Sequence, residues 1–126
     1  MSEAPSIRFD VIGLFPEIVD ACCRYGVVGR ALQRGTVAVV THQLRDYTGG
    51  SHHPIDDDPY GGGPGMVMRP EPIFAAIEHI EGDFGSTGRR VWKILMTPHG
   101  VPFDQPLARD LAARGPELAS ILIFCG

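Results

Sequence analysis

The chain has 126 residues, of which 44% are hydrophobic and 21% are charged, as expected for one globular domain with a real core. Its formal net charge of -4 argues against a protein that holds nucleic acid through a broad basic face of its own, because phosphates are neutralised by clustered Lys and Arg. The apolar runs are too short to cross a bilayer and residues 1–5 do not resemble a signal peptide, so we expect a cytoplasmic protein with no membrane partner.

The first third of the chain predicts a strand, two short helices and a second strand. Residues 7–15 alternate and then become continuously apolar, which is typical of a strand that enters a buried sheet. Pro16 opens a helix that stops at Gly26. A short helix is expected over 29–33, and the β-branched run 36–41 predicts the second strand.

The rest of the chain continues this alternation. Residues 91–96 and 120–125 are predicted strands, and a helix capped by Asp104 lies between them. An earlier helix begins at Pro70, and the expected inward positions of the two helices are Ile73, Ala76, Ile77, Ile80, Leu107, Ala108, Leu111 and Ala112. We therefore predict an α/β fold with a largely parallel sheet, flanking helices and a ligand crevice at the carboxyl ends of the strands. Two such ends are residues 96–100 and 125–126.

Residues 45–66 form a long segment rich in Gly, His, Asp and Pro, which predicts a functional loop. Its most biased part is residues 56–68, Asp-Asp-Asp-Pro-Tyr-Gly-Gly-Gly-Pro-Gly-Met-Val-Met. The spacing fits neither a P-loop nor a dinucleotide-binding fingerprint. Glycines let a ligand approach the backbone, and carboxylates can accept hydrogen bonds from a base edge such as that of guanine. A purely structural turn is the alternative.

Other residues in this chain have less specific patterns. A metal site at His52, His53, Asp56, Asp57 and Asp58 is disfavoured because their spacing matches no common metal motif, and a solvated loop is the alternative. His99 is a candidate general base by residue type alone, in what is otherwise a strand-ending turn. The three cysteines show neither a disulfide nor a zinc pattern and are expected to be buried thiols.

Several motifs together resemble one enzyme family. They are Leu14-Phe15-Pro16-Glu17, Gly26-Val27-Val28-Gly29-Arg30-Ala31, Arg45-Asp46-Tyr47-Thr48, the string from Asp57 to Met66, Thr97-Pro98-His99-Gly100 and Phe124-Cys125-Gly126. In this combination the chain closely resembles the bacterial tRNA (guanine-37-N1) methyltransferases, the TrmD family. The resemblance covers nearly the whole chain, and the Pro-Tyr-Gly-Gly-Gly-x-Gly-Met string is its most specific part.

The resemblance implies a SPOUT-type domain with a trefoil knot, S-adenosylmethionine as the methyl donor, tRNA as the substrate and a homodimer whose two chains build each active site. The implied cofactor-binding residues are Leu95, Met96, Thr97, Pro98, His99, Gly100 and Gly126. The implied substrate-side residues are Asp56, Asp57, Tyr60, Gly61, Gly62, Gly63, Gly65 and Met66. No catalytic residue and no metal ligand is assigned within the chain.

The sequence departs from the family pattern in two ways. It has Met-Thr-Pro-His-Gly at 96–100, where family members usually have Leu-Ser-Pro-Gln-Gly. It also stops at Gly126, where the family continues into the rest of the knot and a C-terminal tRNA-binding domain. We therefore expect 1–126 to be the N-terminal part of a SPOUT domain that does not turn over alone. The alternative from another class is a nucleotide- or RNA-binding module without catalysis.

Overall fold

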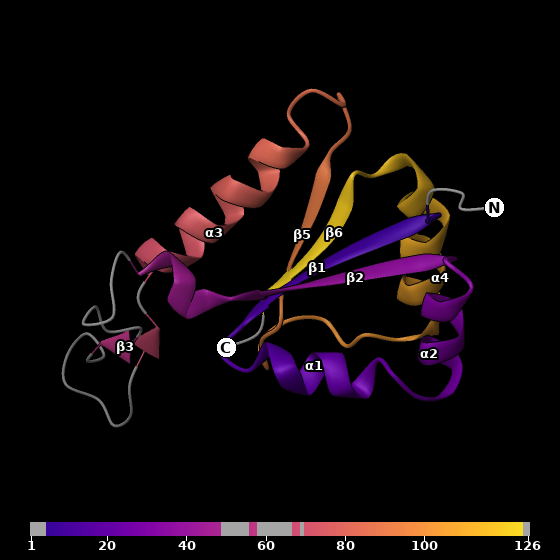
Figure 1. Ribbon diagram of the computed structural model, residues 1–126, viewed down its shortest axis with the longest axis horizontal. Helices are drawn as coiled ribbons and strands as arrows, with labels where there is room; N and C mark the ends of the chain where they lie inside the picture. Colours follow the sequence, from indigo (N-terminus) through magenta and orange to yellow (C-terminus); the bar gives the residue numbers. More distant parts are fainter. Residues whose placement is uncertain (1–4, 49–55, 58–66, 69, 125–126) are drawn as a thin grey trace.

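The computed structural model describes residues 5–48, 56–57, 67–68 and 70–124. A four-stranded parallel sheet, in the order β2-β1-β6-β5, forms its centre (Figure 1). The strands are β1 (Ile7–Gly13), β2 (Val37–Gln43), β5 (Val91–Leu95) and β6 (Ser120–Phe124). The predicted parallel sheet and all four of its predicted strands are confirmed.

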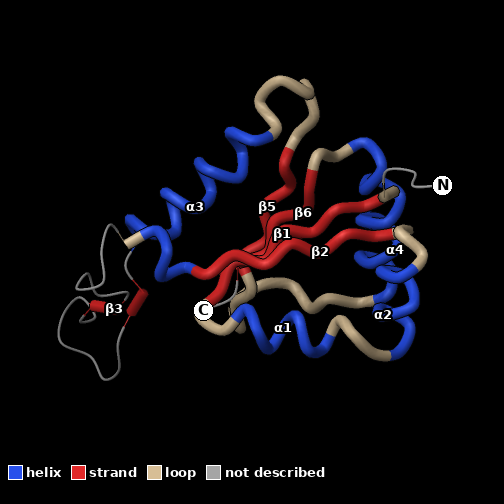
Figure 2. The backbone as a smooth tube through the Cα atoms, in the orientation of Figure 1, coloured by secondary structure: helices blue, strands red, loops and turns tan. Residues whose placement is uncertain are grey.

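Strand β1 holds the sheet together because it pairs on both sides. It runs beside β2 from Ile7↔Val37 to Gly13↔Gln43, and beside β6 from Phe9↔Ile121 to Ile12↔Phe124. Parallel strands need crossover connections, and helices provide them here (Figure 2). All four strands therefore end at the same edge of the sheet.

The helices cover both faces of the sheet. Helix α3 (Pro70–Asp83) lies on one face, while α1 (Pro16–Cys22) and α2 (Gly26–Gln33) lie together on the other (Figure 1). Helix α4 (Gln105–Arg114) shares the face of α1, since its Arg114 lies over the ring of Trp92. No helix in the described part of the chain is long and apolar enough to cross a membrane.

The main core lies between the sheet and α3. Its buried members are Ile12, Leu44, Ala76, Ile80, Leu122 and Phe124. The predicted inward positions of α3 are confirmed: Ala76 and Ile80 are buried, and Ile73 and Ile77 pack against them. Asp104 caps α4 as predicted, accepting a hydrogen bond from the Leu107 N–H at 3.0 Å.

Several sequence predictions are wrong in detail. Helix α2 begins at Gly26, three residues before the predicted start, and Gly26 has a φ of 69° that allows a sharp turn out of α1. Ala112 is exposed although it was predicted to face inward. Cys22 is exposed and Cys23 half-buried, which contradicts the buried-thiol prediction for both, because α1 buries none of its residues.

The segment predicted as one long loop, residues 45–66, contains regular structure. A 3₁₀ helix, η1 (Leu44–Tyr47), follows β2 directly, and β3 (Asp56–Asp57) pairs antiparallel with β4 (Val67–Met68). Loop composition did not reveal η1 because its anchor is tertiary: Leu44 is fully buried in the main core.

Candidate functional site

The ends of the four parallel strands meet at one edge of the sheet, which we call the carboxyl edge. It comprises the ends of β1, β2, β5 and β6 and the residues that follow β1 and β5, namely 14–15 and 96–100. The Met96 N–H donates to the Phe124 carbonyl at 3.0 Å, so the turn after β5 starts beside the end of β6. Ligands of open α/β sheets bind in this position.

The turn at 97–100 is held by its own threonine. The His99 N–H donates to Thr97 Oγ1 at 3.3 Å, and the Gly100 N–H donates to the Thr97 carbonyl at 3.4 Å. Since a hydroxyl also carries a proton, the Thr97 side chain can still donate to a ligand. Residues 95–100 are all exposed, so the turn is accessible from solvent.

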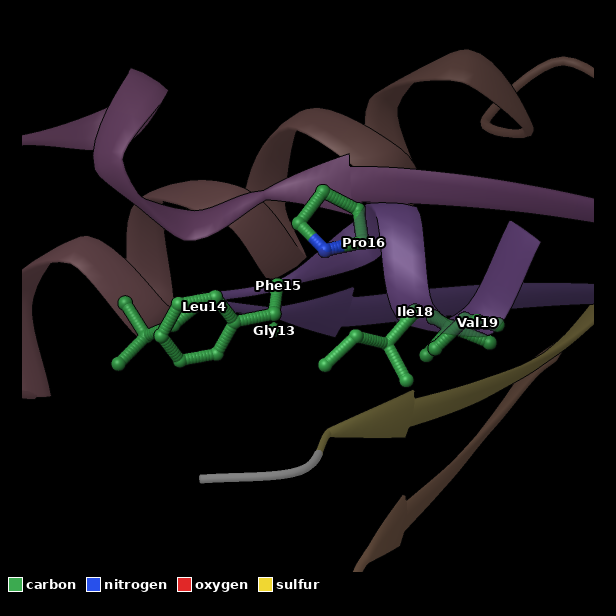
Figure 3. A pocket seen from close by; sticks show the side chains of 7 residues that line it. Gly13, Leu14, Phe15, Pro16, Ile18 and Val19 are labelled. Atoms are coloured by element: carbon green, nitrogen blue, oxygen red, sulfur yellow. The ribbon is translucent and has the colours of Figure 1, made fainter. Parts of the chain in front are cut away.

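A hollow of about 220 Å³ opens where β1 ends. It is lined by Val11, Gly13, Leu14, Phe15, Pro16, Ile18 and Val19. Figure 3 shows the side chains of Leu14, Phe15 and Ile18 projecting to one side of the ribbon. The lining is almost wholly apolar, which suits an aromatic or aliphatic group rather than a phosphate.

Large apolar side chains are exposed around the same edge. Phe15 is 57% exposed, Leu95 is 64% exposed and Phe103, which follows the turn, is 68% exposed. Met96 and Val101 between them are exposed as well. Exposed apolar side chains of this size indicate a site for a ligand or a partner.

The RNA-side residues predicted from the resemblance are only partly described. Asp56 and Asp57 form β3, which pairs with residues close to the start of α3. Tyr60, Gly61, Gly62, Gly63, Gly65 and Met66 lie outside the described residues, as do Gly126 on the cofactor side and the candidates His52, His53, Asp58 and Cys125. Their predicted roles stay predictions.

A polar cluster lies away from the carboxyl edge, on the α3 face of the sheet. It consists of Arg8, Asp10, His42 and Ser120. Asp10 is fully buried, and its carboxylate is 3.0 Å from both Arg8 Nε and Arg8 Nη2 and 2.7 Å from His42 Nε2. Ser120 Oγ also donates to it. The cluster therefore joins β1, β2 and β6.

The electrostatics of Asp10 follow from these contacts. Burial alone would raise its pKa, but hydrogen bonds from Arg8, Ser120 and His42, together with the charge of Arg8, hold the pKa below its ordinary value. Asp10 is thus a carboxylate at neutral pH. Since both carboxylate oxygens accept hydrogen bonds from groups of the fold, we assign Asp10 no chemistry.

Other reactive groups in the described residues show no catalytic arrangement. His99 is exposed, and the contact given above is made by its backbone. Burial, followed by the nearby charges of Asp20 and Cys22, raises the pKa of the Cys23 thiol, which makes it a poor nucleophile. Within the described part of the chain no group of three His, Cys, Asp or Glu residues could hold a metal ion.

Sequence reasoning missed the hollow. Leu14 to Glu17 carried part of the family resemblance but were not proposed as site residues. The sequence did contain an indication of it. Phe15 lies between the end of β1 and Pro16 at the start of α1, where an aromatic side chain has no neighbouring strand residue to cover it.

Comparison with known proteins adds a family match. A family profile described as tRNA (Guanine-1)-methyltransferase TrmD matches residues 7–126. A tRNA (guanine-N(1)-)-methyltransferase of Pelotomaculum thermopropionicum is 41% identical over 120 residues, which are 95% of this chain and 45% of that protein. A protein of the same description from Methylococcus capsulatus is 48% identical over 107 residues, covering 85% of this chain and 41% of that protein.

A solved structure gives the same picture. The crystal structure of tRNA (m1G37) methyltransferase from Aquifex aeolicus matches with a TM-score of 0.81 and 34% sequence identity. The match covers 97% of this chain and 51% of the other. The chain thus spans about half the length of the relatives it matches.

Proposed function

Because this chain belongs to the tRNA (guanine-1)-methyltransferase TrmD family, we propose that it contributes to methylation of N1 of guanine 37 in tRNA. The family match over residues 7–126 carries the proposal. The SPOUT-type α/β fold and the exposed carboxyl edge support it, because that edge is where such a sheet binds a small ligand.

For the methyl donor we propose S-adenosylmethionine at the carboxyl edge. Leu95, Met96, Thr97, Pro98, His99, Gly100 and Gly126 would hold it. The chemistry of the described part fits: Leu95 and Met96 expose apolar surface for an adenine ring, and the Thr97 hydroxyl keeps a proton to donate. When bound, this group supplies a methyl on a positively charged sulfur.

For the RNA side we propose the segment that carries Asp56, Asp57, Tyr60, Gly61, Gly62, Gly63, Gly65 and Met66. Carboxylates can accept the N–H donors on the guanine edge. Guanine N1 carries a proton at neutral pH, and that proton must leave as N1 takes the methyl group. The target base must also be taken out of its stack. We assign no general base within this chain.

The assembly we propose is a cytoplasmic homodimer with a trefoil knot, in which residues 1–126 form the N-terminal part of the SPOUT domain. The exposed apolar side chains of the carboxyl edge support the need for a covering partner. This proposal predicts that the 126-residue chain alone does not turn over.

The test uses the protein that contains this segment. Labelled methyl from S-adenosylmethionine should be transferred to a tRNA transcript with guanine at position 37 and not to one with adenine there, and nuclease mapping should place the label at N1 of that guanine. Transfer to another position, or none with a folded dimer, would contradict the proposal.

An RNA-binding module without catalysis is the second candidate, and the net charge of -4 gives it little support because such modules rely on clustered cations. Calorimetric titration separates the two functions. A methyltransferase site should bind S-adenosylmethionine more tightly than adenosine, whereas a module that recognises only the nucleoside should bind both equally.

A further inference from the structure

Gln43 is the last residue of β2, and its side-chain amide makes two hydrogen bonds to different parts of the chain. Its Nε2 donates to the Leu14 carbonyl at 3.1 Å, and its Oε1 accepts from the Arg45 N–H at 3.2 Å. Leu14 lines the hollow at the end of β1, and Arg45 lies in η1. The Gln43 side chain therefore connects a residue that lines the hollow with a residue of η1.

This bridge continues the sheet where its ladder stops. The last paired residues of β1 and β2 are Gly13 and Gln43. Beyond them β1 turns into α1, so the Leu14 carbonyl faces no further strand residue of β2. Gln43 supplies the missing donor, since a half-buried carbonyl without a partner is unfavourable.

Helix η1 is fixed on its other sides. Leu44 is fully buried in the main core. The rings of Tyr47 and His79, the latter from α3, lie 5.8 Å apart. With the Gln43 side chain as its cap, η1 is joined to β2, to the core and to α3. It is thus a rigid element, and the RNA-side segment follows it in the sequence.

Resting on the proposed function, we propose that Gln43 is a positioning residue that holds η1, the element that precedes the RNA-side segment in the sequence, at a fixed place relative to the end of β1 at the carboxyl edge. Methyl transfer needs the nucleophile and the methyl carbon aligned, and misplacement of about 1 Å can cost on the order of 100-fold in rate. Loss of the bridge should lower kcat more than it weakens the binding of either substrate.

Two variants separate the two halves of the bridge. Gln43→Met keeps the size and removes both hydrogen bonds. Gln43→Glu keeps the acceptor for the Arg45 N–H but, when ionised, cannot donate to the Leu14 carbonyl. We expect kcat to fall about 10- to 100-fold in both, with KM for tRNA and for S-adenosylmethionine within about threefold of wild type. If Gln43→Glu restores wild-type kcat, Gln43 only caps η1 and the proposal is overturned.

Thr41→Val is the matched control. Thr41 lies on the same strand, and its hydroxyl bonds to Asp20 of α1 at 3.2 and 3.3 Å, so the change removes side-chain hydrogen bonds from β2 without touching η1. Its kcat should stay within about twofold of wild type. An equal fall in Thr41→Val and Gln43→Met would assign the effect to general loosening of β2 and would overturn the proposal.

A second readout does not depend on activity. Amide exchange at Arg45 should be faster in Gln43→Met and unchanged in Gln43→Glu, because only the first loses the acceptor. If the wild-type protein transfers no methyl group, the proposed function fails, whereas the exchange result still decides whether Gln43 fixes η1. Unchanged exchange in both variants would overturn the bridge itself.

Discussion

The polar cluster and the carboxyl edge differ in how far their side chains are buried and paired. In the cluster, a fully buried carboxylate is bonded to groups from three strands, and no buried polar side-chain atom in the described residues lacks a partner. At the edge, large apolar side chains such as Phe15 and Leu95 are more than half exposed. The first arrangement is complete within the chain, whereas the second leaves apolar surface uncovered.

This difference separates stability from function. Substitutions in the cluster should lower the free energy of unfolding, because they leave buried polar groups unpaired. Substitutions at the edge should leave the fold intact and weaken what binds there. Variants of Asp10 and Leu95 test the two sides of this contrast, and Gly29 in α2 adds a test of backbone packing away from both, with the largest expected effect first.

Replacing Asp10 by Ala should have the largest effect. It removes the acceptor for Arg8, His42 and Ser120 at once and leaves the donors of His42 and Ser120 in a buried site. Breaking a buried ionic pair on one side costs about 3–5 kcal/mol, so we expect the free energy of unfolding in urea to fall by that amount. As a control, Asp110→Ala, which removes an exposed pair with Arg114, should change it by less than about 0.5 kcal/mol. Equal effects would contradict the contrast.

Replacing Gly29 by Ala should destabilise the fold by about 1–3 kcal/mol. A Cβ at this position would lie 2.6 Å from the backbone oxygen of Arg24, which cannot swing away as a side chain could. Gly82→Ala is the control, because a Cβ there meets nothing within 4 Å and Ala favours a helix. Thermal unfolding should show a lower Tm for the first variant and no lower Tm for the second.

The stability of the fold should fall at acidic pH through Asp10. Its pKa in the fold lies below the ordinary 3.8, so the carboxylate form stabilises the folded state. This stabilisation is fully present above pH 3.8 and is lost as the pH falls through the lower, folded-state pKa. Unfolding free energies from pH 7 to pH 2 should therefore fall more steeply for wild type than for Asp10→Asn. If the free energy of unfolding changed with pH equally in both proteins, Asp10 would not contribute to the pH dependence of stability.

Replacing Leu95 by Ala should change stability least. Its side chain is 64% exposed, so we expect less than about 0.5 kcal/mol in the free energy of unfolding. In the protein that contains this segment, the affinity for S-adenosylmethionine should fall clearly. Arg109→Ala, an exposed change on α4, should alter neither quantity. Unchanged affinity in Leu95→Ala would place the donor elsewhere.

Much of the fold could be predicted from the sequence, because local patterns determine it. The β-branched run before Gln43 predicted β2, and the spacing of Ile73, Ala76 and Ile80 predicted the buried face of α3. Tertiary features could not be predicted. Helix η1 depends on the burial of Leu44, and α1 exposes an apolar stripe that its sequence would equally allow to be buried.

The position of the carboxyl edge could be predicted from the sequence, whereas the contacts made there could not. Alternating strands and helices located the carboxyl edge, and the motif at 96–100 lies there. Gln43 gave no signal, since glutamine is not a usual helix cap and its partner Leu14 is 29 residues away. Contacts across such a distance depend on the register of β1 and β2, which single-sequence patterns do not contain.

The strand order also has a consequence for biosynthesis. Strand β6 lies between β1 and β5, and Ser120 bonds to Arg8, a residue 112 positions earlier. Until residues 120–124 have left the ribosome, β1 has a partner strand on one side only, and β5 lacks β6, the strand with which it pairs. Such unpaired strands favour aggregation, and pairing over long separations is slow. We expect chaperones to bind nascent chains that end before Ser120 more strongly than chains that extend beyond Phe124.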